Sequence, residues 1–155
     1  MDSLTPQFWI GIGVAILSGG IIGFERQIRG KPAGIRTSIL VCLGTSIFIN
    51  LGTMFNNGNV DPTRVLGQVV TGVGFLGAGV IIAHEGLVKG VTTATVIWVL
   101  AGIGAMIGFK LFLSAIATSF ITVGILTGIE FLENSVRKLR RGAHSIEGEE
   151  NMKEE

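Results

Sequence analysis

The sequence predicts an all-α fold, a polytopic membrane bundle of five transmembrane helices. Three observations support this. The chain is 48% hydrophobic and 15% charged, against roughly 25% charged in an average soluble domain, and its mean hydropathy is +0.63. Of its 23 acidic and basic residues, only 11 lie in residues 1–129, too few to coat a soluble globule. Those residues form five uncharged runs, each of about the 20 residues that a helix needs to cross a bilayer.

Each run has plausible helix boundaries. Pro6 and Pro62 suit the first turn of the first and third helices. The second run becomes polar at residues 56–59, so its helix is expected to end near Phe55. The fourth and fifth runs are separated by one charged residue, and Ile107–Lys110 predicts a tight helical hairpin. The five expected spans are Ser3–Phe24, Thr37–Val60, Val65–Ala83, Gly90–Phe109 and Leu111–Ile129.

The positive charges predict the orientation in the membrane. With the N-terminus outside, ten Lys and Arg residues lie inside and two, Arg64 and Lys110, lie outside. We therefore expect N-out, C-in topology, with a five-span domain at 1–130 and a cytoplasmic tail at 131–155. The tail is basic and then acidic, and we expect it to be partly disordered. Its basic part would bind either anionic lipid or a protein partner.

Several classes of function are disfavoured by the composition and motifs. The single cysteine, Cys42, excludes a disulfide framework and a cysteine-based zinc site. The run Gly72–Gly77 has the spacing of a dinucleotide-binding loop but lies inside an apolar span, away from the strand that such a loop requires. We expect no enzymatic activity, no cofactor beyond Mg²⁺ as a ligand, and no nucleic-acid partner.

Glycine is abundant, at 24 residues, and most of it lies inside the expected spans. Small residues four positions apart let helices approach closely in lipid. We expect such packing at two pairs with this spacing, Gly19/Gly23 and Gly104/Gly108, and along the glycine-rich series that contains Gly74, Gly77 and Gly79.

A candidate internal repeat appears at a displacement of 60 residues. Gly19–Glu25 then aligns with Gly79–Glu85, and Ile28–Gly30 with Val88–Gly90. Duplication would relate two parallel two-helix units by an axis along the membrane normal, with the fifth helix added.

Polar side chains at span ends are the candidate functional residues, because burying them in a membrane is costly. Glu25 either forms a structural ion pair with Arg26 or Arg36, or faces a vestibule where it contacts a cation, together with its repeat partner Glu85. The other candidates share polar chemistry near a span end: Arg26, Arg36, Thr37, Arg64, Gln68, Thr92 and Thr93.

These residues lie in motifs that resemble the MgtC/SapB family of bacterial inner-membrane proteins. The matching blocks are Gly23–Gln27, Ala33–Thr37, Gly72–Ile81 and Gly90–Ala94, in order within Leu17–Gly108. The resemblance implies a multi-pass protein of the bacterial inner (plasma) membrane that acts in magnesium homeostasis. Some members have Asn at the position of Thr92 and Cys at that of Val99, so roles that need those groups are not carried over.

Three functional hypotheses follow. The first is Mg²⁺ transport or sensing, with Glu25 and Glu85 as the one or two carboxylates that a hydrated Mg²⁺ usually contacts. The second is a regulatory subunit that binds another membrane protein, such as a transporter or the ATP synthase, through glycine-rich helix faces. The third is a scaffolding oligomer. Five short spans make a thin bundle, so we expect a homodimer under all three.

Overall fold

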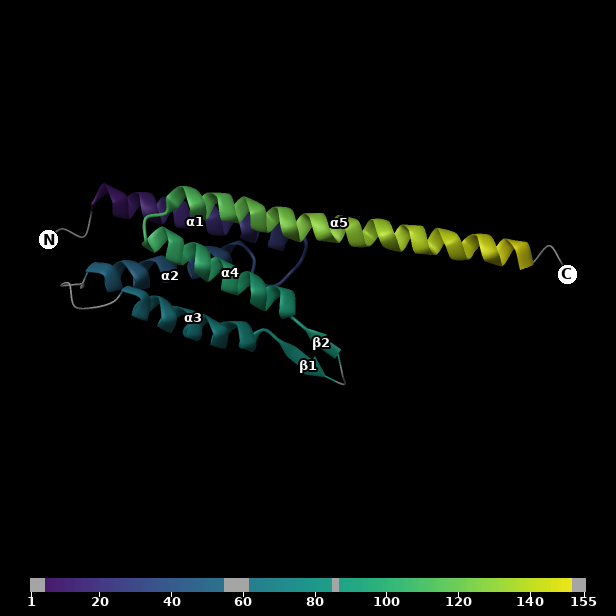
Figure 1. Ribbon diagram of the computed structural model, residues 1–155, viewed down its shortest axis with the longest axis horizontal. Coiled ribbons are helices and arrows are strands. Elements are labelled where there is room, and N and C mark those ends of the chain that lie inside the picture. Colours follow the sequence, from purple (N-terminus) through teal and green to yellow (C-terminus); the bar gives the residue numbers. More distant parts are fainter. Residues whose placement is uncertain (1–4, 55–61, 85–86, 152–155) are drawn as a thin grey trace. The chain divides into compact units, whose positions relative to one another are not determined.

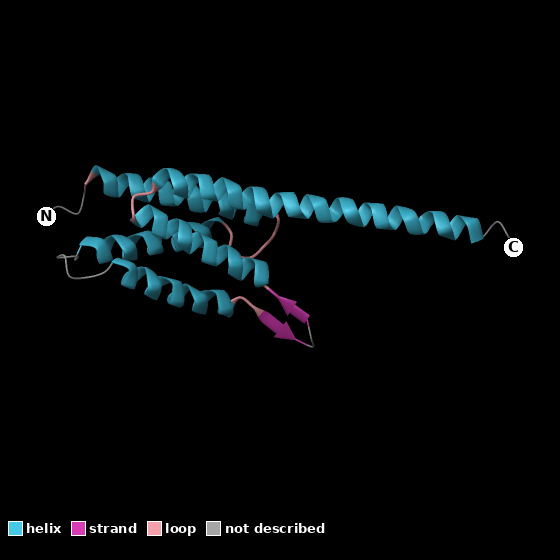
Figure 2. Cartoon of the chain, viewed as in Figure 1, coloured by secondary structure: helices cyan, strands magenta, loops and turns pink. Residues whose placement is uncertain are grey.

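The computed structural model describes residues 5–54, 62–84 and 87–151 (Figure 1). Helices dominate it, and the only strands in these ranges form one short hairpin (Figure 2). The chain forms two compact units, Met1–Ile121 and Thr122–Glu155. The elements are α1 (Pro6–Ile28), α2 (Ile35–Met54), α3 (Pro62–Gly79), β1 (Ile82–His84), β2 (Leu87–Lys89), α4 (Val91–Gly108) and α5 (Phe112–Asn151).

The helix ends follow local sequence signals. The expected first-turn prolines are confirmed, since α1 begins at Pro6 and α3 at Pro62. At Gly30 (φ 62°) and Lys110 (φ 64°) the backbone turns left-handed directly after α1 and α4. In each turn the following amide donates to a carbonyl five positions earlier, at 2.9 and 2.8 Å, which closes the helix end. The expected tight hairpin between the fourth and fifth helices is therefore confirmed.

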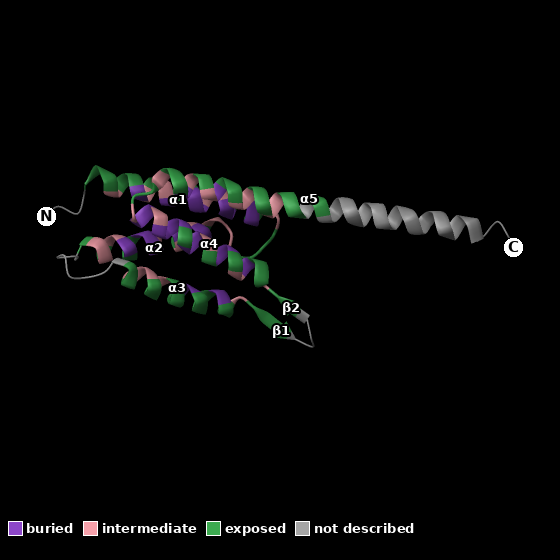
Figure 3. Ribbon diagram, in the orientation of Figure 1, coloured by how far each residue is buried: buried purple, intermediate pink, exposed green. Residues whose placement is uncertain are grey.

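In the first unit, α2 packs against both α1 and α4, and α3 packs mainly on α4 (Figure 1). Buried residues gather where these helices face one another (Figure 3). Many large apolar residues are exposed. Ile22, Ile49 and Leu100 are almost fully buried, whereas Phe24 and Phe75 are exposed. An apolar exterior around a packed interior is the pattern of helices that face lipid.

Within the described residues, four helices are long and apolar enough to cross a membrane: Pro6–Ile28, Ile35–Met54, Val91–Gly108 and Phe112–Ile129. The chain is thus a helical membrane protein. The expected third span is present as α3 but is not among these four, because Arg64 and Gln68 lie within its 18 residues. The crossing of the bilayer by α3 stays a prediction. The N-out, C-in topology depends on that crossing and also stays a prediction.

The third span was expected to continue to Ala83, and here the prediction is wrong. The helix stops at Gly79, and β1 pairs antiparallel with β2, with Ile82 opposite Lys89. The chain folds back so closely that a Cβ at Gly90 (φ 91°) would overlap the Val80 carbonyl oxygen, so this position requires glycine. The apolar content of residues 80–83 fits a helix and a hairpin equally well.

The hairpin also bears on the candidate repeat. Residues 20–28 are helical, whereas their repeat counterparts include both strands. The aligned segments therefore differ in secondary structure, and the repeat gains no support from the fold. Helix α5 continues beyond the expected end at Ile129 to Asn151. The division into a spanning domain, 1–130, and a tail, 131–155, stays a prediction.

Candidate functional site

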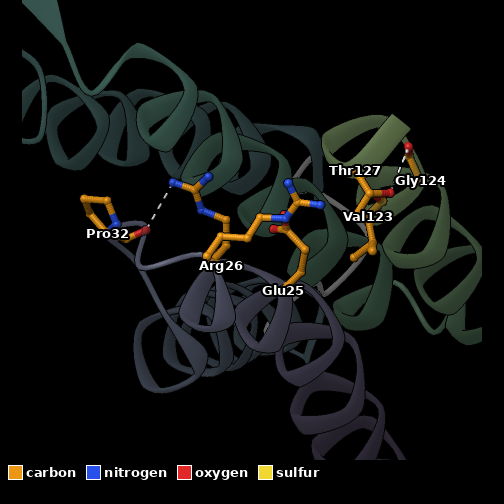
Figure 4. A network of polar contacts seen from close by, with 7 residues as sticks. Glu25, Arg26, Pro32, Val123, Gly124 and Thr127 are labelled. Atoms are coloured by element: carbon orange, nitrogen blue, oxygen red, sulfur yellow. Dashed lines mark hydrogen bonds and ion pairs between the residues drawn. The ribbon is translucent and has the colours of Figure 1, made fainter. Parts of the chain in front are cut away.

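Most of the polar candidates, but not Arg64 and Gln68, come at one end of the first unit, where α1 and α3 end and α2 and α4 begin. We call it the Glu25 end. Glu25 and Arg26 occupy the last turns of α1, and both are buried although both are ionisable, with 8% and 3% of their surface exposed. A buried charge is stable only when it is paired or hydrogen-bonded, so the partners of these two side chains define the site. Figure 4 shows Glu25 and Arg26, with the bond of Arg26 to the Pro32 carbonyl.

Arg26 connects the α1–α2 loop to the start of α4. Its Nη2 donates one hydrogen bond of 3.2 Å to the carbonyl oxygen of Pro32 and another of 2.8 Å to Oγ1 of Thr93. Thr93 lies in the first turn of α4 and is buried. The guanidinium therefore joins the end of α1 to the α1–α2 loop and to the start of α4. Its Nε is buried and has no hydrogen-bond partner among the described residues.

Of the two carboxylate oxygens of Glu25, one has a partner among the described residues and the other has none. Its Oε1 lies 2.7 Å from Nε of Arg29, one helical turn further along α1. The ion pair is thus with Arg29, and not with Arg26 or Arg36 as the sequence suggested; the spacing of four residues on one helix was the signal for it. The second oxygen, Oε2, is buried and has no hydrogen-bond partner in the part of the chain that the structure describes.

The loop between α1 and α2 is held by several hydrogen bonds. The amide of Ile35 donates to Oε1 of Gln27 at 3.3 Å, and Oγ of Ser38 donates to the carbonyl of Ala33 at 3.2 Å. Ala33 has a positive φ of 59°, as Gly30 does. Bonds at both ends fix the backbone of this loop relative to α1 and α2.

Four of the glycines expected on packing faces lie where two helices nearly touch. A Cβ at Gly19 would lie 2.7 Å from Cα of Ile39, and one at Gly23 would lie 2.5 Å from Cα of Ile35, both on α2. Gly104 and Gly108 of α4 approach α2 in the same way, with added Cβ atoms 2.5 Å from the Cys42 carbonyl oxygen and from Cβ of Ile49.

The other three expected glycines lie in open or ordinary surroundings. A Cβ at Gly77 would meet Ala94 at 3.6 Å, which is normal contact. Gly74 and Gly79 have no heavy atom of the described chain within 4 Å of such a Cβ. Sequence reasoning missed two close approaches, at Gly52, whose added Cβ would lie 2.6 Å from Val65, and at Gly90. Gly52 lacks the four-residue spacing to another small residue that marked the pairs Gly19/Gly23 and Gly104/Gly108.

The remaining candidates do not join the site. Arg36 and Thr37 are exposed at the start of α2, and Thr92 is exposed beside the buried Thr93. Arg64 and Gln68 are exposed on α3. Glu85 lies outside the described residues, so its pairing with Glu25 stays a prediction. No group of three or more His, Cys, Asp or Glu side chains comes together in the described ranges to hold a metal.

The chain matches the model of the MgtC family over residues 12–135. It is 39% identical over 130 residues to a putative magnesium transporter, YhiD, of Escherichia coli K12, covering 79% of this chain and 60% of that protein. It is 44% identical over 108 residues to the protein MgtC of Brucella abortus strain 2308, covering 69% and 45%. The protein MgtC of Salmonella typhimurium LT2 is 40% identical over 146 residues, covering 94% and 61%. The chain thus spans between about half and three fifths of these relatives' lengths. No solved structure matches it.

Proposed function

The chain belongs to the MgtC family, and from that membership we propose that it acts in magnesium homeostasis in the bacterial inner membrane. One similar protein is described as a putative magnesium transporter. This chain covers only 60% of that relative. The similarity therefore supports a role in magnesium homeostasis, but the relative's transport activity is not assigned to this chain.

We further propose that the protein transports or senses Mg²⁺ through Glu25. The observation that carries this is the buried Oε2 atom, which lacks a hydrogen-bond partner among the described residues. Mg²⁺ keeps several of its waters and is commonly held by one or two carboxylates, so one buried carboxylate oxygen suits a hydrated ion. Arg29 already occupies the other oxygen. A bound Mg²⁺ would compete with this guanidinium, so the carboxylate would exchange an internal cation for an external one.

Ion flux separates transport from sensing. The full chain is reconstituted into liposomes that contain a fluorescent Mg²⁺ indicator, beside empty liposomes and liposomes with Glu25→Gln. Transport predicts Mg²⁺ entry above the empty vesicles and a clear reduction in the variant. Sensing predicts no entry but Mg²⁺ binding that depends on Glu25. If the protein shows no flux and no Glu25-dependent binding of Mg²⁺, a direct role of this residue with the ion is refuted.

A second candidate function is regulation of another membrane protein, such as a transporter or the ATP synthase. It is favoured by the outer face of α3, where Gly67, Gly72, Gly74 and Gly79 would all accept a Cβ without meeting any described atom within 4 Å. Phe75 on the same helix is 81% exposed. Small residues with an exposed aromatic neighbour suit the close approach of a foreign helix.

Photocrosslinking in cells tests the regulatory function. A photoreactive amino acid replaces Phe75, and the control replaces Phe24, which is 60% exposed on α1. Regulation predicts a crosslinked adduct with a larger membrane protein at Phe75 and not at Phe24. An adduct with a second copy alone would instead support the expected homodimer, and equal adducts at both positions would contradict a specific docking face.

A further inference from the structure

We propose that the α1–α2 loop and the base of the β1–β2 hairpin together form a binding site for anionic phospholipid headgroups. Lys31, Arg36 and Lys89 would supply the cations. This inference goes beyond the proposed magnesium function and does not depend on it, because it concerns the lipid that surrounds the bundle and not the ion.

The three cations come next to those ends of α1, α2 and α4 that lie at the Glu25 end. Lys31 comes three residues after α1 ends at Ile28, Arg36 is the second residue of α2, and Lys89 comes two residues before α4 begins. All three side chains are exposed. Helices α1, α2 and α4 are candidate spans. At about 1.5 Å per helical residue, cations within three residues of a span end lie at the depth of the headgroups.

The hydrogen bonds of Arg26 hold the α1–α2 loop next to the start of α4, which directly follows the hairpin. Its guanidinium holds the carbonyl of Pro32, next to Lys31, and also Oγ1 of Thr93, four residues after Lys89. The backbone of Lys89 is held by its pairing with Ile82. A site whose backbone is already held loses less conformational freedom when a ligand binds, which strengthens binding.

Among the described side chains, the charges at the Glu25 end favour an anionic ligand. The described acidic side chain at the Glu25 end is Glu25 itself, which is buried and paired with Arg29. Lys31, Arg36 and Lys89 therefore present positive charge that Glu25 does not cancel. Lys and Arg side chains next to a membrane attract anionic lipids by about 1 kcal/mol each, or about fivefold in affinity.

The apolar neighbours select a lipid over a soluble anion or an acidic protein. Ile28, Ile82 and Val88 are 70%, 65% and 55% exposed, and all lie within seven residues of one of the three cations. Exposed aliphatic side chains beside exposed cations suit the boundary between headgroups and acyl chains, where both find favourable surroundings. A soluble phosphate would leave these aliphatic side chains uncovered.

Lipid binding to the detergent-purified full chain tests the proposal. Native mass spectrometry measures the retention of phosphatidylglycerol and of phosphatidylcholine by the unmodified chain, by Lys31→Gln/Arg36→Gln/Lys89→Gln, and by the control Arg64→Gln/Lys110→Gln. The control removes two exposed cations from the opposite end of the unit, where α3 begins and α4 ends. We expect the unmodified chain and the control to prefer phosphatidylglycerol. The triple variant should bind it roughly a hundredfold more weakly, from about fivefold per cation.

Three results would overturn the proposal. The first is an unchanged preference for phosphatidylglycerol in the triple variant. The second is an equal loss of phosphatidylglycerol retention in the control variant. The third is displacement of the lipid by inorganic phosphate at equal concentration, which would indicate a site for free anions. If the triple variant fails to fold, the single variants Lys31→Gln and Lys89→Gln decide, since both side chains are exposed. Each should then weaken retention about fivefold, and no weakening in either would overturn the proposal.

Discussion

Arg26 and Thr93 are 67 positions apart in the sequence and are joined by a buried hydrogen bond of 2.8 Å between Nη2 and Oγ1. Each belongs to one of the short motifs by which the chain resembles its family, Gly23–Gln27 and Gly90–Ala94. The two motifs thus meet in space and form one end of the bundle. The bond gives a structural reason for an arginine at the end of α1 and a hydroxyl in the first turn of α4.

Thr93→Val should destabilise the protein. Valine keeps the shape of threonine but removes the acceptor, so a buried N–H of Arg26 loses its partner, at a cost of about 1–3 kcal/mol. The matched control is Thr95→Val on the same helix, because Thr95 is exposed and its hydroxyl donates only to the Val91 carbonyl of its own turn, at 3.0 Å. Unfolding in mixed micelles with increasing SDS measures both. Equal stability of the two variants would show that the bond contributes nothing.

Gly104→Ala should destabilise the bundle, whereas Gly102→Ala should not. A Cβ at Gly104 would lie 2.5 Å from the Cys42 carbonyl oxygen and 2.7 Å from Cβ of Thr45, so α4 and α2 would have to separate. Overpacking of this kind typically costs about 1–3 kcal/mol. At Gly102 the space is open, and alanine should stabilise the helix by roughly 0.5–1 kcal/mol. The same SDS titration measures both, and a neutral Gly104→Ala would contradict the close helix contact.

The sequence predicts the positions of α1, α2 and α4 well, because an uncharged run of about 20 residues bounded by proline, glycine or charge has few alternatives in a membrane protein. Helix α5 begins where expected but continues beyond the expected end at Ile129 to Asn151. The end of α3 could not be predicted. Residues 80–83 are as apolar as a span requires, and the hairpin depends on pairing with residues 87–89 and on the close approach of Gly90 to Val80, contacts that no local pattern reveals.

The candidate site was predictable in its residues and not in its contacts. Burial of Glu25 and Arg26 follows from their position at the end of an apolar run. Three arginines lie near Glu25 in the sequence, and the four-residue spacing to Arg29 was the helical signal that selects its partner. No local pattern identifies Thr93 as the acceptor for Arg26, because the bond depends on how α1 and α4 pack.

A reporter fused after Glu155 should be active only on the cytoplasmic side. This outcome depends on α3. The helix packs along α4 and α2, and its 18 residues give a length of about 27 Å, close to the thickness of the hydrocarbon core. If α3 crosses, five spans bring the C-terminus to the side opposite the N-terminus. Paired alkaline phosphatase and green fluorescent protein fusions measure the side. Periplasmic activity would mean that α3 does not cross or that the orientation is reversed, and a fusion after Thr5 separates these two cases.

Glu25→Gln should reduce the stabilisation of the purified protein by Mg²⁺. An ion that binds only the folded state stabilises it by RT ln(1 + [Mg²⁺]/Kd), about 1.4 kcal/mol for each tenfold rise in concentration above Kd. Glutamine keeps the size of the side chain and one acceptor oxygen but removes the charge that a divalent ion requires. The melting temperature should therefore rise with MgCl2 in the unmodified protein and stay nearly flat in the variant, with NaCl at equal ionic strength as the control.

Arg29→Gln separates an ion site from a purely structural ion pair. If Mg²⁺ competes with the Arg29 guanidinium for the carboxylate, removing that guanidinium frees Oε1 beside the already unpartnered Oε2. Mg²⁺ should then stabilise Arg29→Gln more steeply than the unmodified protein at low concentrations. A purely structural pair predicts a different pattern: both variants lose stability at every Mg²⁺ concentration, and the dependence on Mg²⁺ stays parallel to that of the unmodified chain. Parallel curves would remove Glu25 from the magnesium function and leave it as the anchor that holds Arg29 at the end of α1.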